Sequence, residues 1–432
     1  MKEIVKNKLS KKKISILLEL TFLFLPFGSY VLSFSIGFMT IYPSLVLISI
    51  LTLLGFFLFK KEEFNKTERY TLIFLASWII YAIIYLPFIN GIGNAIIDIR
   101  ALILMFMYTF SFFWTYKYLG LEKWKKIILS GVKLYFFLLL IFAFFEIQTG
   151  IHFQGFFTDK LLNLDPSLTH YAPVYIYDNP NNFVCIFILL GILLLSLNKS
   201  YRTNHYALAF ITVAIYFISN ISDARIGKVI AIILILYTSI IIVKAKFKIK
   251  KHFLVHLTII ISLFLVFGQE KYYGPIWQTI KHKNTSQTVV ANTSLNSIQV
   301  RTNLYYNSIE ALKSSNYLGI GPGQFRQYSI EKKFKLNTET NISPHSWLFE
   351  IYSQYGILIF GGYLYIFVLI LLYFKNNFRK HTNQIIFLII ALTCFGLSSF
   401  LPSSFLSMEI NWIFLSIIVI VSTNLETYGE QS

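Results

Sequence analysis

The chain has 432 residues, of which 56% are hydrophobic, 18% aromatic and only 13% charged, and its mean hydropathy is +0.62. A soluble domain typically carries about 25% charged residues, so this composition excludes a soluble enzyme, a disordered chain and a secreted disulfide scaffold. The net charge of +18 would suggest nucleic acid in a soluble protein, but here the charges must first be placed relative to a membrane. Cys185 and Cys394 lie inside apolar runs and indicate neither a disulfide framework nor a zinc site.

Apolar runs bounded by polar clusters predict the membrane spans. A bilayer core needs about 20 apolar residues per helix. The first run lacks a small-residue cleavage site and a second run follows at once, so we expect a retained helix rather than a signal peptide. The sequence therefore predicts an all-α integral membrane protein with about 12 transmembrane helices, at 14–34, 38–59, 70–89, 96–116, 127–148, 181–198, 205–220, 224–243, 252–268, 347–373, 384–401 and 405–422.

The positive charges fit a chain with both termini in the cytoplasm. With the amino terminus inside, 24 of the 38 Lys and Arg fall in segments that would be cytoplasmic, whereas the short outer loops hold only Lys160. This bias is the one that orients membrane proteins. Nine more Lys and Arg lie in residues 269–346, and long translocated segments do not follow that bias. Most of the excess charge is therefore explained by topology, and no nucleic acid is required.

Two outer segments, 149–180 and 269–346, exceed a tight connection. In the larger one, apolar residues recur at helical spacing, which predicts an amphipathic helix over 298–315: Val300, Leu304, Ile309 and Leu312. We therefore divide the chain into three parts. Residues 1–268 would hold helices 1–9, residues 269–346 a large, partly helical extracytoplasmic loop, and residues 347–432 helices 10–12 with a short cytoplasmic tail.

Ionisable side chains inside spans are costly, so each is a functional candidate unless it can reach an interface. Glu19 and Lys133 lie near the inner ends of their helices, and we expect them to snorkel. The other charges begin spans at the outer face: Asp98, Arg100, Arg225, Lys228, Glu350 and Glu409.

Arg225 and Lys228 would share one face of a helix because they are three residues apart. Arginine presents a planar fork that matches phosphate oxygens, and lysine adds a compact charge, so the pair suits an anionic lipid head group. The alternative is a set of structural ion pairs, for instance Arg225 with Asp223 or Asp98 with Arg100.

The outer loop ends in a glycine-rich segment and a histidine. The segment Gly319-Ile-Gly-Pro-Gly323 resembles a phosphate loop only superficially, because it follows no clear strand and lacks the Walker and Rossmann spacings. A tight turn that brings the backbone close to another surface fits better. Downstream, His345 lies where the polar loop reaches the tenth span. An unperturbed pKa of about 6.5 makes it a candidate base or phosphate donor; an interfacial structural role is the alternative.

These residues resemble a known family, the bacterial O-antigen ligase and O-antigen polymerase superfamily. The stretch from Pro344 to Gly361 is similar to its His-(Asn/Ser) signature and the span that follows. The stretch from Arg301 to Phe325 resembles the Arg, helix and Gly-x-Gly-x-Gly-x-Phe pattern that ends its large outer loop.

Two shorter elements are also similar to the family, Ser222-Asp-Ala-Arg225-Ile-Gly and Asn179-Pro-Asn181. The chain departs from the pattern at Ala224, where the family has a second Ser, and at Ser346, where Asn is common. Neither departure removes a charge, so both concern the branch within the family.

The resemblance implies a metal-independent, inverting glycosyltransferase that needs no cofactor. The donor would be an undecaprenyl-diphosphate-linked oligosaccharide and the acceptor a glycan hydroxyl, at the outer face of a bacterial cytoplasmic membrane. Arg225 and Arg301 would bind the diphosphate, and His345 would orient or deprotonate the acceptor hydroxyl or hydrogen-bond the diphosphate. Further residues expected to bind the diphosphate or the glycan are Arg100, Lys228, Glu350, Asn181, Gly321 and Gly323.

Within the family we favour a polymerase that joins lipid-linked repeat units for capsule, exopolysaccharide, O-antigen or a teichuronic-type wall polymer. The Lys-, Asn- and Ile-rich composition indicates an AT-rich genome, common in Gram-positive bacteria, which lack the lipid A core that a ligase modifies. A ligase with a different acceptor is the first alternative. A flippase or other secondary transporter is the alternative from another class, but it would place charges along a midplane cavity. Membrane lipids and a chain-length regulator and flippase of the same pathway are the expected partners.

Overall fold

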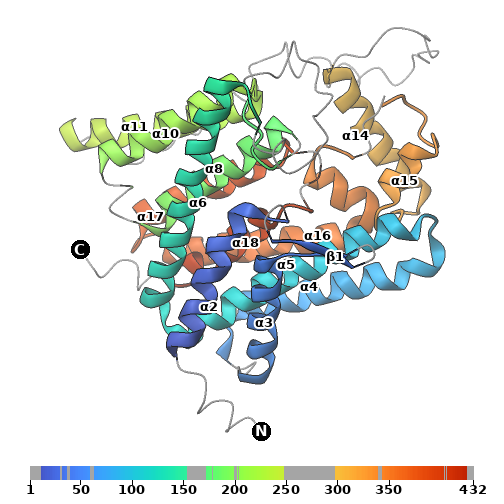
Figure 1. The fold of residues 1–432 in the computed structure, drawn as a ribbon, viewed down its shortest axis with the longest axis horizontal. Helices are drawn as coiled ribbons and strands as arrows, with labels where there is room; N and C mark the ends of the chain where they lie inside the picture. Colours follow the sequence, from blue (N-terminus) through green and yellow to red (C-terminus); the bar gives the residue numbers. More distant parts are fainter. Residues whose placement is uncertain are drawn as a thin grey trace.

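In the residues that it describes, the computed structural model consists of helices and one short pair of strands (Figure 1). The expected ninth span, 252–268, lies outside the residues that it describes, as do the loop segments 153–171 and 269–296. The described residues are 11–29, 32–36, 39–58, 63–152, 172–177, 179–198, 202, 204–247, 297–338, 343–402, 404 and 406–425.

A helix occupies the expected position of each span that falls within these residues. The first eight are α2 (Lys11–Phe24), α3 (Pro43–Leu58), α4 (Lys66–Tyr85), α5 (Ile92–Leu119), α6 (Leu121–Thr149), α8 (Pro180–Leu197), α10 (His205–Ile221) and α11 (Arg225–Phe247). The last three are α16 (Trp347–Asn377), α17 (Thr382–Ser398) and α18 (Glu409–Thr423). The predicted amphipathic helix is α14 (Ser297–Ser314), which buries Val300, Leu304 and Leu312, and the short α15 (Gln324–Ile330) follows it.

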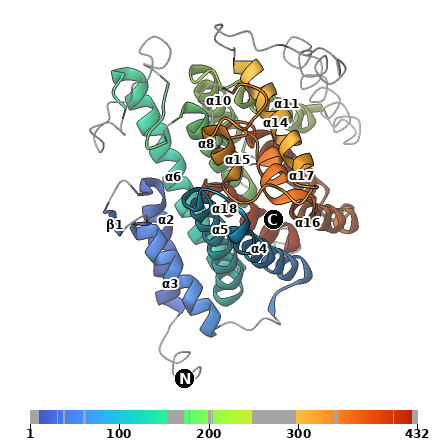
Figure 2. The ribbon, with the colours of Figure 1, turned by 90° about the vertical axis from the view of Figure 1, so that its right-hand side faces the viewer.

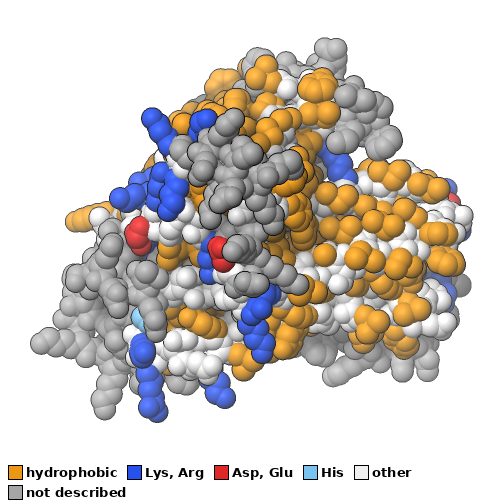
Figure 3. All heavy atoms as spheres, turned by 90° about the horizontal axis from the view of Figure 1, so that it is seen from below, with side chains coloured by type: hydrophobic (Ala, Val, Ile, Leu, Met, Phe, Trp, Pro, Cys, Tyr) orange, Lys and Arg blue, Asp and Glu red, His pale blue; other side chains and the backbone are white. Residues whose placement is uncertain are grey.

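Among the described residues, five helices are long and apolar enough to cross a membrane, namely Lys66–Phe88, Ile92–Leu119, Leu121–Thr149, Pro180–Leu197 and Trp347–Asn377. Four shorter helices, α3, α10, α17 and α18, are also apolar. Large apolar side chains are exposed on the outward faces of several helices, as at Phe56, Ile84, Ile141 and Leu358. Figure 3 shows a broad field of such side chains on one face of the molecule. A soluble protein rarely exposes so much apolar surface, and the predicted class, an all-α membrane protein, is confirmed.

The core is formed by helices that are apolar on all sides. Every residue from Phe183 to Leu197 of α8 and from Ile410 to Ser422 of α18 is buried. Such helices are stable only when other helices surround them. Helix α5 packs against α3, α4, α6 and α18 and connects the amino-terminal helices with this core.

The structure corrects the boundary between the first two spans. The expected runs 14–34 and 38–59 meet instead at a short helical turn, Leu25–Phe27, and at an antiparallel pair of strands, β1 (Phe34–Ile36) and β2 (Met39–Ile41). Pro26 lies in that turn. A proline has no N–H to donate and its ring clashes with the preceding helical turn, so α2 ends before it.

The tenth span also differs from expectation because it is interrupted. Helix α16 contains non-helical backbone at Gly356, whose φ is 74° and ψ is −178°. The sequence predicted one continuous span over 347–373.

Candidate functional site

Two of the three residues expected to be catalytic meet between α14 and the start of α16. Arg301 is half-buried on the second turn of α14, and its Nη1 donates to the carbonyl oxygen of Phe400 at 3.3 Å. His345 lies immediately before α16, close enough to Arg301 for the two to interact electrostatically. One helical turn further on, the rings of Tyr305 and Phe349 stack with centroids 4.4 Å apart. Figure 2 shows α14 beside α16.

His345 has an unusual backbone conformation and a lowered pKa. Its backbone lies in the left-handed region, with φ at 52°, which costs a non-glycine residue free energy and is concentrated at functional sites. Burial, and to a lesser extent the positive charge of Arg301, lower the pKa of His345 from 6.5 to about 4. The imidazole is therefore neutral at pH 7. A neutral imidazole can accept a proton, which suits a base or an orienting group better than a cationic phosphate ligand.

Glu350 supports the loop that connects α17 with α18. It is buried, and its two carboxylate oxygens accept hydrogen bonds from Ser404 Oγ at 2.6 Å and from Leu406 N at 3.4 Å. The same loop provides the Phe400 carbonyl that Arg301 contacts. Glu350 therefore positions the 399–408 loop beside the Arg301–His345 pair. The sequence carried no signal for Phe400, because only its backbone is used.

Arg100 belongs to a different cluster. Its Nη2 donates to the carbonyl oxygen of Thr40 at 3.1 Å, and its charge acts on Glu409 at the start of α18. The hydroxyls of Tyr42 and Tyr108 donate to the two oxygens of Glu409, that of Tyr108 at 2.8 Å. Arg100 is thus engaged by a neighbouring backbone and a carboxylate, and it connects the end of the strand pair with α5 and α18.

The suggested ion pair of Asp98 with Arg100 does not form among the described contacts. Asp98 instead accepts hydrogen bonds from Gly323 N at 2.8 Å and from Tyr355 Oη at 3.2 Å. Arg326 is the cation whose charge acts on it. Sequence reasoning identified Asp98 as a charge at the start of a span but missed its partners, because they lie more than 200 positions away.

Arg225, Lys228 and Asn181 lie at the adjoining starts of α11 and α8. Gly227 and Val184 are in close contact there, since a Cβ on Gly227 would lie 2.9 Å from Val184 Cγ1. Lys228 Nζ is 2.8 Å from Asp223 Oδ1, so the ion pair in this segment is made by the lysine.

Arg225 begins α11 and its side chain is exposed. At the start of α8, the backbone N–H of Asn181 is bonded to the Asn179 side chain, which caps that helix.

The glycine-rich segment forms the close-packed turn that the sequence favoured over a phosphate loop. The N–H of Gly321 donates to Gln354 O at 2.8 Å, and that of Gly323 donates to Asp98. A Cβ on Gly323 would lie 2.5 Å from Asn94 O. Both N–H groups are satisfied inside the protein. The prediction that Gly321 and Gly323 bind the diphosphate or the glycan stays a prediction.

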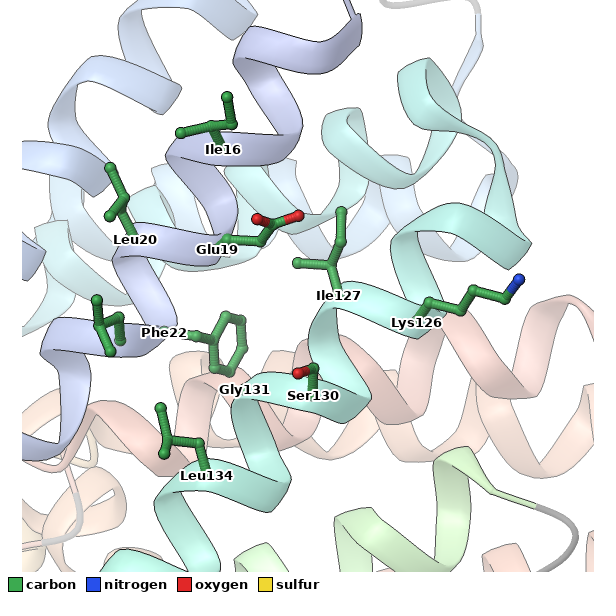
Figure 4. Close-up of a pocket in the computed structure, with 10 residues that line it drawn as sticks. Ile16, Glu19, Leu20, Phe22, Lys126, Ile127, Ser130, Gly131 and Leu134 are labelled. Carbon is green, nitrogen blue, oxygen red and sulfur yellow. The ribbon is translucent and has the colours of Figure 1, made fainter.

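A groove of about 560 Å³ lies elsewhere, between α2 and α6. Figure 4 shows Glu19 directed toward α6 and Lys126 at the edge of the groove. Ser15 Oγ donates to Glu19 at 3.0 Å. The groove is otherwise mostly apolar. It is separate from the Arg301–His345 pair, and within the part of the chain that the structure describes no group of three His, Cys, Asp or Glu residues could hold a metal ion.

The fold and the site define a helical membrane protein in which an arginine and a neutral histidine meet where a long loop joins the tenth expected span. Residues 206–364 match the family model described as O-antigen ligase. Over 164 residues the chain is 30% identical to the teichuronic acid biosynthesis protein TuaE of Bacillus subtilis strain 168. That alignment covers 37% of this chain and 33% of TuaE, so the chain matches about a third of its relative's length.

These two matches confirm the resemblance to the O-antigen ligase and O-antigen polymerase superfamily, and the family match covers residues 206–364. The matched region includes Arg225, Arg301 and His345. Arg100 and Asn181 lie outside it.

Proposed function

We propose that the protein is a polysaccharide repeat-unit polymerase. It would transfer an undecaprenyl-diphosphate-linked glycan to a sugar hydroxyl at the outer face of a bacterial cytoplasmic membrane, with inversion and without a metal. The observation that carries the proposal is the Arg301–His345 pair inside the matched region. The bundle would have 12 spans and both termini in the cytoplasm. The product would be a capsule, exopolysaccharide, O-antigen or teichuronic-type polymer.

The chemistry of the reaction explains why an arginine and a neutral histidine would suffice. The acceptor oxygen bonds to the anomeric carbon while the bond from that carbon to the diphosphate breaks. The leaving diphosphate gains negative charge, which a cation stabilises more effectively than a proton donor would. Arg301 and Arg225 would bind the diphosphate, and His345 would take the proton of the acceptor hydroxyl. Arg100 and Lys228 contribute less to this proposal, because Thr40 and Asp223 already engage them.

The relative is named for teichuronic acid biosynthesis and the family model is described as O-antigen ligase. A ligase would use the same donor and differ in its acceptor. The arginine and histidine would serve either reaction, so the acceptor distinguishes the two.

The test uses lipid-linked repeat units that accumulate in a strain lacking the protein. Purified full-length protein is incubated with these units alone, and we expect a ladder of longer lipid-linked glycans. Product that forms only after a second acceptor is added would indicate a ligase. No transfer under either condition, with repeat units trapped at the inner face in the deletion strain, would indicate a flippase and overturn the proposal.

A further inference from the structure

The interruption of α16 leaves backbone groups that need partners. At Gly356 the chain leaves helical geometry, so Ser353 O, Gln354 O and Ile357 N lose their helical hydrogen bonds. Unsatisfied backbone groups inside an apolar span are strongly destabilising, because no water is present there to bond to them. A broken helix is therefore stable only where another segment bonds to it.

The glycine-rich loop provides these bonds. Ile320 N donates to Ser353 O at 2.9 Å, Gly321 N donates to Gln354 O at 2.8 Å, and Ile357 N donates to Tyr317 O at 3.0 Å. We call this junction of residues 317–321 with residues 353–357 the α16 splice. Helix α4 supports it from the other side.

Two tyrosines of α4 donate hydrogen bonds to the glycine-rich loop of the α16 splice. Tyr81 Oη donates to Leu318 O at 2.5 Å and Tyr85 Oη donates to Gly319 O at 2.9 Å.

Glycine is required on both sides of the splice. Gly319 and Gly356 have φ values of 91° and 74°, which side-chain-bearing residues rarely adopt. A Cβ on Gly319 would lie 2.5 Å from Gly356 N, and a Cβ on Gly356 would overlap Leu318 O. By contrast, a Cβ on Gly361, one turn along the same helix, would meet nothing within 4 Å.

The α16 splice lies at the far end of the helix pair that carries Arg301 and His345. Helices α14 and α16 run side by side in the same direction. Arg301 is close enough to His345 to act on it electrostatically, and one turn later Tyr305 stacks on Phe349. About three turns beyond His345, the splice ties the end of α14 to α16. Sliding of one helix against the other would break all three backbone hydrogen bonds of the splice.

We propose that Gly319 and Gly356 are positioning residues, because the α16 splice locks the register of α14 against α16 and so holds Arg301 against His345. The expected loss of glycan transfer rests on the proposed function. The expected change in the geometry of the Arg301–His345 pair does not depend on that function.

The first experiment replaces Gly356 or Gly319 by Ala in the full-length protein. A misplacement of about 1 Å at a reacting centre can reduce a rate about 100-fold, and we expect a loss of that order in transfer. Independently, histidine-labelled protein is titrated by NMR. We expect the pKa of His345 to rise from about 4 toward 6.5 in both variants, because Arg301 moves away and the site opens. Gly361→Ala is the matched control and should change neither measurement.

A second variant covers the case in which the glycine variants do not insert. Tyr81→Phe combined with Tyr85→Phe removes two hydroxyl donors to the splice and keeps every glycine. A rise in the pKa of His345 in this variant supports the proposal. An unchanged pKa of His345 in whichever variants insert overturns it. If the wild-type protein transfers no glycan, the proposed function fails, whereas the titration still tests the register.

Discussion

At the residue scale, the properties of His345 depend on its surroundings. Histidine has an unperturbed pKa of about 6.5, but burial and Arg301 reduce that of His345 to about 4. The folded protein therefore binds a proton at this site less readily than the unfolded chain does. At pH values between about 6.5 and 4, protonation of the unfolded chain lowers the stability of the fold, and this loss grows as the pH falls.

The same shift predicts the pH dependence of transfer. If neutral His345 acts on the acceptor hydroxyl, the rate should stay nearly constant from pH 8 to about 5.5 and fall as the pH approaches the pKa of about 4. His345→Ala should lose about 100-fold or more in rate. Initial rates over this pH range, on protein that stays inserted, give the measurement. A rate that halves near pH 6.5 would contradict the prediction.

Removal of the neighbouring charge provides the control. Arg301→Gln should raise the pKa of His345 because the cation that disfavours the imidazolium is lost. Lys313→Gln, on the same helix but with a side chain 57% exposed, should leave that pKa unchanged.

At the element scale, α5 and the loop before α15 are joined by one carboxylate. Asp98 accepts from Gly323 N and Tyr355 Oη, while Asn94 Nδ2 donates to Gln327 Oε1 at 2.8 Å. These bonds dock the end of the outer loop on the start of α5. They also explain why Asp98 does not neutralise Arg100, two positions away in the same helix.

Asp98→Ala should therefore weaken the attachment of the loop. Loss of the acceptor leaves a buried N–H and hydroxyl unsatisfied, at a cost of about 1–3 kcal/mol. We expect a lower midpoint of thermal unfolding in detergent. Asp223→Ala is the control, since its side chain is 76% exposed and its bond with Lys228 is a surface ion pair, worth about 0–1 kcal/mol. Equal midpoints for the two variants would show that Asp98 has no anchoring role.

At the scale of the whole molecule, the charge bias of the loops predicts which parts face outward. The proposed topology places α14 outside and the connection between α16 and α17 inside. Both native cysteines are buried, so single cysteines introduced at exposed positions should dominate labelling.

A membrane-impermeant maleimide applied to intact cells should label Lys313→Cys. Arg379→Cys, in the connection after α16, should be labelled only after the membrane is permeabilised, because Arg379 would lie inside. After detergent solubilisation both should react, which controls for accessibility. Labelling of Arg379→Cys in intact cells would reverse the orientation and place His345 in the cytoplasm.

Hydropathy and spacing along the chain were enough to predict the membrane class, the approximate positions of the described apolar helices and the amphipathic α14. These are local properties, because each helix satisfies its own backbone and its apolar residues are close in sequence. The resemblance to the O-antigen ligase and polymerase superfamily was likewise visible in the sequence.

The tertiary structure decided which polar groups meet. Arg301 lies near His345, whereas Arg100 bonds to Thr40, Asp98 holds Gly323, and α16 breaks where the glycine-rich loop bonds to it. A charge or a glycine has many potential partners along a chain, and only the packing of distant segments selects among them. For that reason the sequence could identify the candidate residues of the site, but not their arrangement.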